Sequence, residues 1–101
     1  MSRKEFNAGS SLGMFLGFKL SQEALESGRD WIRARRPRVV RDGDLARSLR
    51  ADLVPVDPWP GSSRALAALA AARSLIWEAR MRGELREIEG AWGHKFWVGV
   101  R

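Results

Sequence analysis

The chain has 101 residues, a length that predicts one domain with a modest hydrophobic core. It has no cysteine, which excludes a disulfide framework and thiol chemistry, and no stretch approaches the roughly 20 apolar residues of a membrane span. The net charge is +6, and the basic residues are 15 arginines and 3 lysines. Arginine suits bidentate contact with phosphate or carboxylate, although a GC-rich genome also favours it.

The N-terminal third predicts a polar arm followed by a long helix. Residues 1–8 are expected to form a flexible arm, and residues 9–36 a helix that continues or restarts after a kink and ends before Pro37. Small residues recur every four positions in its first part, a pattern that lets another helix approach closely. The members of this glycine row are Gly9, Gly13 and Gly17.

Residues 6–20 leave three interpretations open. They can pack against a second helix, lie as an anchor in a membrane surface, or order only within a larger assembly. They do not resemble a signal peptide, because glycine and serine interrupt the apolar run and no small-residue cleavage site follows. We therefore expect a cytoplasmic protein, or one within an intracellularly assembled particle.

The strongest charge feature lies between residues 29 and 50, where eight arginines accompany three aspartates. Such a cluster is typical of a surface that contacts nucleic acid or an acidic protein. The competing interpretation is a solvated helix end, whose cations lie near the negative pole of the helix dipole. The candidate contact residues are Arg33, Arg35, Arg36, Arg38 and Arg41.

The middle of the chain predicts short elements. Val39 and Val40 suit a very short strand, and Asp42-Gly43-Asp44 suits a turn that caps a short helix over about 45–52. No further acids at suitable spacing support a metal site at these aspartates. Three prolines make residues 53–61 an extended connector.

Residues 62–89 predict the longest helix. Alanine and leucine fill residues 65–72, a serine can cap the N-terminus, and Gly90 is a natural stop. One face carries large groups at an eleven-residue interval, such as Leu66 and Trp77. Small residues line another face, which we expect to pack antiparallel against the glycine row. The members of this small face include Ala65, Ala68 and Ala72.

Residues 90–101 predict a β-like tail, because apolar side chains alternate from His94 to Val100. Such a strand must pair with 38–41, with 54–56 or with another molecule. Aromatic residues among cations can stack nucleic-acid bases, but packing onto the body or a partner is the alternative. The candidate partner-docking aromatics are Trp92, Phe96 and Trp97.

Catalytic chemistry is not expected. His94 is the only histidine and has no nearby acid, which argues against a nucleophilic triad and against a histidine metal site. Glu78 and Glu84 each have an arginine four residues away, so ion pairs on a helix surface explain them. We expect no cofactor, no metal ion and no small-molecule substrate.

Together these features predict a mainly α fold: two long helices, about 9–36 and 62–89, packed antiparallel, with a short helix and a β-like C-terminal tail. The expected function is a non-enzymatic structural or adaptor subunit of a larger assembly, for example a virion. It would meet other protein subunits, as a homo- or hetero-oligomer, through its small-residue helix faces and aromatic tail. Two alternatives are a nucleic-acid-binding protein using Arg33–Arg41 and a membrane-surface protein anchored by residues 6–20.

Overall fold

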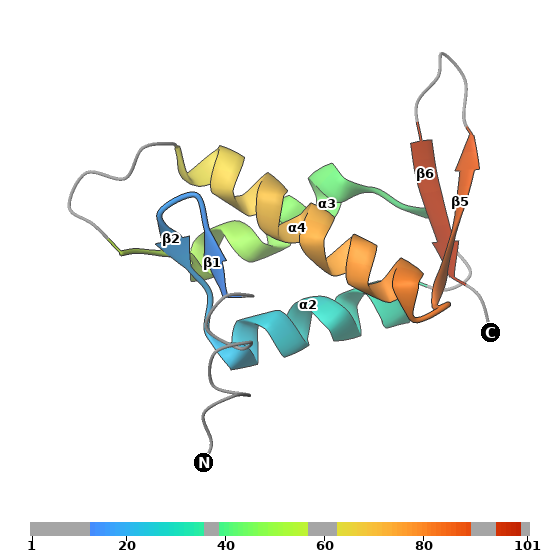
Figure 1. The fold of residues 1–101 in the computed structure, drawn as a ribbon, viewed down its shortest axis with the longest axis horizontal. Helices are drawn as coiled ribbons and strands as arrows, with labels where there is room; N and C mark the ends of the chain where they lie inside the picture. The colour runs from blue at the N-terminus through green and yellow to red at the C-terminus, as the bar shows by residue number, and fades with distance from the viewer. Residues whose placement is uncertain (1–12, 36–38, 57–62, 90–94, 100–101) are drawn as a thin grey trace.

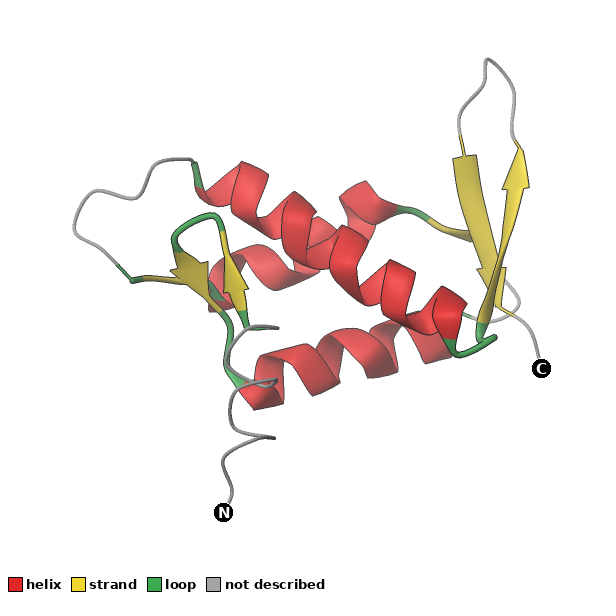
Figure 2. Cartoon of the chain, viewed as in Figure 1, coloured by secondary structure: helices red, strands yellow, loops and turns green. Residues whose placement is uncertain are grey.

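The computed structural model describes residues 13–35, 39–56, 63–89 and 95–99. These residues form three helices and two small three-stranded antiparallel sheets, so the fold mixes α and β structure instead of being mainly α. The two sheets lie at opposite ends of the helical layer (Figures 1 and 2).

The chain enters the described part through a β-hairpin made of β1 (Met14–Phe15) and β2 (Phe18–Lys19). Leu16 and Gly17 join the strands with φ angles of 53° and 86°. Two successive positive φ angles are typical of a type I′ turn, whose twist matches that of the flanking strands. The other edge of β2 pairs with β4 (Val54–Pro55).

The hairpin shows that the helix expected over residues 9–36 is wrong for residues 13–20. Gly13 precedes β1 and Gly17 lies in the turn, so neither contributes to a helical ridge. The four-residue glycine spacing reflects turn chemistry, because glycine adopts a positive φ without a steric cost. Gly9 lies outside the described residues.

Two helices follow, each with a clear start. α2 (Gln22–Ala34) begins after Ser21, whose hydroxyl accepts a hydrogen bond from the Ala24 N–H at 3.0 Å. α3 (Asp42–Leu49) continues into one 3-10 turn, η1 (Arg50–Asp52). α3 begins three residues before the expected Leu45. The two aspartates lie in its first turn, where negative charge is favourable, and not in a preceding cap.

The longest helix, α4 (Arg64–Met81), begins after Ser63, whose hydroxyl accepts from the Leu66 N–H at 3.2 Å. It ends eight residues earlier than expected. Gly83 has φ 79°, and the Glu84 N–H bonds the Ala79 carbonyl at 2.8 Å, as in a Schellman motif. In the sequence, this early end is indicated by Gly83, which lies inside the range expected for the helix.

The C-terminal sheet has the order β3-β6-β5, with β3 (Val39–Val40), β5 (Leu85–Glu89) and β6 (Lys95–Gly99). The expected C-terminal strand is confirmed. So is its pairing with 38–41, because Val40 lies opposite Trp97. The second partner, β5, was missed because its residues were assigned to the long helix.

The antiparallel packing expected for the two long helices is wrong, because α2 and α4 run parallel (Figure 1). Gly28 lies against Leu75, and further along both helices Arg29 pairs with Glu78. α3 is the antiparallel neighbour of α4, since its first residue, Asp42, bonds Arg73. With three helices in an up-down-up order, the first and the third must be parallel.

The hydrophobic core lies where α4 meets α2 and α3. Two members of the expected small face, Ala68 and Ala72, are at most 1% exposed, whereas the third, Ala65, is exposed. No described helix is long and apolar enough to cross a membrane. The largest fully buried side chains are Leu25, Ile32, Leu45, Leu49 and Val40.

Candidate protein-docking surface

Large apolar side chains lie on the solvent side of α4. Leu66 is 55% exposed, Trp77 58% and Met81 66%. A stripe of residues follows spacings of three and four, so its members share one side of the helix. The members of this stripe, which we call the outer face of α4, are Leu66, Leu69, Arg73, Trp77, Arg80 and Met81.

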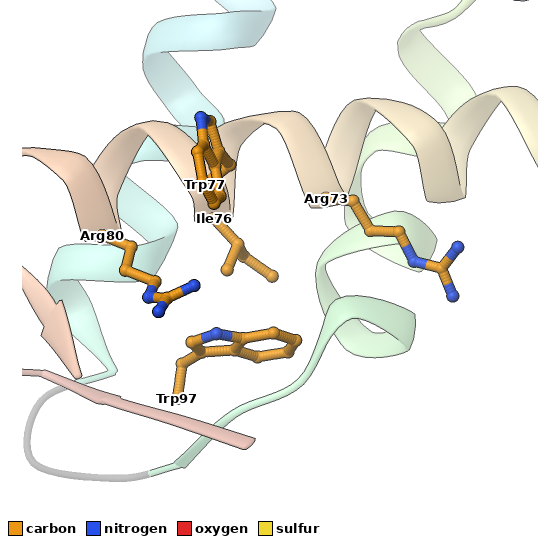
Figure 3. Close-up of a pocket in the computed structure, with 5 residues that line it drawn as sticks. All are labelled: Arg73, Ile76, Trp77, Arg80 and Trp97. Atoms are coloured by element: carbon orange, nitrogen blue, oxygen red, sulfur yellow. The ribbon is translucent and has the colours of Figure 1, made fainter. Parts of the chain in front are cut away.

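A cleft of about 230 Å³ opens between the outer face of α4 and strand β6. Figure 3 shows the Trp97 indole lying across this cleft opposite Ile76, with Arg80 on one side and Arg73 on the other. Trp77 completes the lining from α4. We call it the tryptophan cleft; its walls are apolar and its flanks are cationic.

A second hollow, of about 190 Å³, lies between α3 and α4. Alanine and leucine side chains provide its apolar surface, and two arginines of α3 and η1 contribute to its lining. The residues that line this α3–α4 groove are Gly43, Ala46, Arg47, Arg50, Ala65, Ala68 and Leu69.

Arginines give both hollows a positive character. Each hollow has two of them, and no acidic residue occurs among the described residues that line either one. Arg73 donates to Asp42 at 3.0 Å, and Arg80 lies 3.2 Å from Glu87. The Arg80 guanidinium also lies 5.7 Å from the centre of the Trp77 ring. These contacts position the arginines beside the apolar surface.

The basic cluster expected at residues 33–41 is held largely by contacts within the chain. Arg33 lies 3.1 Å from Asp30 and 3.8 Å from Glu84. The Arg35 guanidinium lies 4.7 Å over the Trp31 ring and 3.9 Å from an Asp44 oxygen. Arg41 is exposed. Arg36 and Arg38 lie outside the described residues.

An ion-pair network joins α2 to the end of α4. Glu78 accepts a hydrogen bond from Arg29 Nε at 2.9 Å and another from Arg82. Partial burial alone would raise the pKa of Glu78, but these hydrogen bonds outweigh burial and hold the pKa below its ordinary value. The hydrogen bond to Glu78 likewise raises the pKa of Arg29. The expected pairing of Glu78 with Arg82 is confirmed.

The predicted helix-packing and partner-docking residues lie in different parts of the structure. Ala68 and Ala72 are buried, whereas Ala65 is exposed and lines the α3–α4 groove. Trp97 lines the tryptophan cleft, and Phe96 belongs to the same strand. Trp92 lies outside the described residues.

Sequence reasoning missed the four arginines of the two hollows. The sequence did carry a signal for Arg73 and Arg80, because they follow Leu66, Leu69 and Trp77 at helical spacing on the side of α4 opposite its alanines. No comparable pattern in the sequence indicates that Arg47 and Arg50 lie beside α4, because their position depends on how α3 packs against α4.

The surface of the two hollows presents apolar side chains together with arginines. Within the described ranges, no three histidine, cysteine or acidic side chains gather as a metal site would require. The chain matches no protein-family model, no curated protein and no solved structure. Its function is therefore inferred from the geometry and chemistry of the surface itself.

Proposed function

We propose that this protein is a non-enzymatic adaptor subunit that binds another protein along the outer face of α4. The observation that carries the proposal is the exposure of three large apolar side chains, Leu66, Trp77 and Met81, on one side of a single helix. Contiguous exposed apolar surface beside a cleft, bordered by polar groups, is typical of interaction sites.

The free energy of burying apolar side chains supports docking as a role for these three residues. Fully burying a side chain of this class contributes about 1.5–3 kcal/mol. Because each of the three is more than half exposed, a partner can gain roughly half of that value at each position. Tryptophan and arginine are also the residue types that most often dominate binding energies at interfaces.

A different protein fits this surface better than a second copy of the chain. A symmetric dimer brings the same patch of both copies together, so Arg73 and Arg80 would face the arginines of the other copy. The net charge of +6 adds to that repulsion. The nucleic-acid alternative has less support, because the large exposed side chains Leu66, Trp77 and Met81 are apolar and do not contact phosphates as cations do.

Site-specific crosslinking in the cells that make the protein tests the proposal. A photoreactive residue replaces Leu66, Trp77 or Met81 in turn, and Gln22 or Ser27, exposed positions of α2, serve as controls. We expect one shared crosslinked protein from the three α4 positions and none from the α2 positions. Crosslinks of equal yield from both helices, or none from α4, would refute the proposal. A product of twice the chain mass would assign the face to self-association instead.

A further inference from the structure

We infer that the partner segment is an acidic amphipathic helix that inserts two apolar anchor residues, one into the tryptophan cleft and one into the α3–α4 groove. This inference rests on the proposed function, because it specifies what lies against the outer face of α4. It follows from the size of the two hollows, their separation along α4 and the arginines that line them.

The hollows have the size of side-chain pockets. Their volumes are about 230 and 190 Å³, below the roughly 300–1,000 Å³ of sites that enclose small molecules. Each therefore suits a single side chain of a larger partner. The tryptophan cleft offers Trp97 and Ile76 as its apolar contacts, and the groove offers Ala65 and Leu69.

The separation of the hollows matches a helix. The α4 residues that line the groove are centred near position 67 and those that line the cleft near position 76, or about 14 Å along the helix axis. A second helix lying along α4 presents two anchors on one face when they are seven, eight or eleven residues apart, and these spacings rise about 10–17 Å and bracket this distance. The three- and four-residue spacing of the outer face also forms the ridges and grooves that a helix packs into.

The arginines select an acidic segment. Arg47 and Arg50 lie at the groove, and Arg73 and Arg80 lie at the cleft. Arg47 lies 3.8 Å from Asp44, and Arg73 lies 3.0 Å from Asp42. The two arginine side chains are nevertheless 80% and 64% exposed, so carboxylates of a partner can share both guanidinium groups. A glutamate three or four residues from each anchor falls beside these guanidinium groups, because such positions are neighbours on a helix surface.

Synthetic peptides test the inference with the full-length protein. The first probe is a fluorescently labelled, 21-residue helical peptide with leucine anchors eight residues apart and glutamates beside them. One control peptide carries lysine in place of glutamate, and a second carries alanine in place of the anchors. Binding is followed by fluorescence anisotropy. We expect the acidic anchored peptide to bind at least about tenfold more tightly than either control, and to weaken as salt rises.

Variants of the protein locate the two anchors. Trp77→Ala opens the cleft, and Ala65→Phe fills the groove. Each is expected to weaken binding of the anchored peptide about tenfold or more, whereas Val54→Ala, at another exposed apolar position, should leave it unchanged. With the anchor-free peptide, Ala65→Phe should have no effect. Circular dichroism of each variant excludes unfolding as the cause.

The inference is overturned by equal binding of the acidic and lysine peptides, by no binding of any peptide, or by binding that does not depend on Trp77. Binding of a single-stranded 20-nucleotide oligonucleotide with the same dependence on Trp77, without binding of the acidic peptide, also overturns it, because the surface then recognises nucleic acid. If crosslinks still form from the α4 positions in these cases, the docking function stands and only the identity of the partner segment is wrong.

Discussion

Replacement of Gly28 by alanine is expected to destabilise the protein although it improves helix propensity. Alanine gains about 1 kcal/mol over glycine inside a helix. A Cβ atom at Gly28, however, would lie 2.6 Å from Cδ1 of Leu75 and 3.3 Å from Cδ2 of Leu49. Both leucines are at most 3% exposed, so neither has room to move away. Overpacking of this kind costs about 1–3 kcal/mol, which leaves a net loss of about 1 kcal/mol.

Gly43 provides the matched control. It lies in the first turn of α3, and a Cβ atom there would meet nothing within 4 Å. Gly43→Ala should therefore stabilise the protein by about 0.5–1 kcal/mol. Urea denaturation measures both effects, and the transition midpoint should fall for Gly28→Ala and rise for Gly43→Ala.

A double mutant tests whether Leu75 causes the loss. Leu75→Val removes a buried methylene and is destabilising by itself, by about 1 kcal/mol. In the Gly28→Ala background it also relieves the clash, so the double mutant should be more stable than the sum of the single effects predicts, by at least about 0.5 kcal/mol. Additive effects, or a Gly28→Ala variant as stable as Gly43→Ala, would show that the close contact between α2 and α4 is not the limiting factor.

Three further predictions use the same stability measurement. Leu16→Asn should stabilise the protein by about 0.5–1 kcal/mol, because asparagine tolerates the φ of 53° in the type I′ turn; an unchanged midpoint contradicts this. Glu78→Gln should cost about 1 kcal/mol near neutral pH. Because the folded-state pKa of Glu78 is lowered, that cost should shrink as the pH falls below about 4.5, and a pH-independent cost contradicts the ion-pair role. Trp77→Ala should cost about 0.5–1.5 kcal/mol, since this side chain is 58% exposed; a loss of about 3–5 kcal/mol would make Trp77 part of the core.

The sequence was informative where local chemistry decides the structure. Short patterns predicted the serine cap of α4 and the C-terminal strand, whereas Val39–Val40 was one of three possible partners for that strand. The hairpin was not, because Leu16-Gly17 lacks the asparagine or aspartate that usually marks a type I′ turn. The parallel arrangement of α2 and α4 differs from the prediction because the short helix expected over about 45–52 packs along α4 and reverses the chain, instead of only joining the long helices.

The candidate site was predictable only in part, because its exposure depends on how the helices pack and not on the sequence of α4 alone. Periodicity places Leu66 and Trp77 on one side of α4, but it cannot say whether that side meets the core or the solvent. Burial depends on which faces α3 and α2 cover, and these helices cover the alanine side. The tryptophan cleft also needs Trp97 of β6. Strand β6 lies next to α4 because it pairs with β3 and β5.

The stability of this chain alone does not favour the distribution of side chains on α4, whose buried side holds Leu75, Ile76 and otherwise alanines. Alanines such as Ala67 and Ala71 fill the core and are fully buried, while Leu66, Trp77 and Met81 lie mostly in solvent. Small residues in the core let α3 and α2 approach closely, which explains the buried side. On the exposed side, the large apolar side chains bury little of their area against the described part of the chain. A partner that covers the outer face of α4 gives these residues a physical role, because only then does their apolar area leave water.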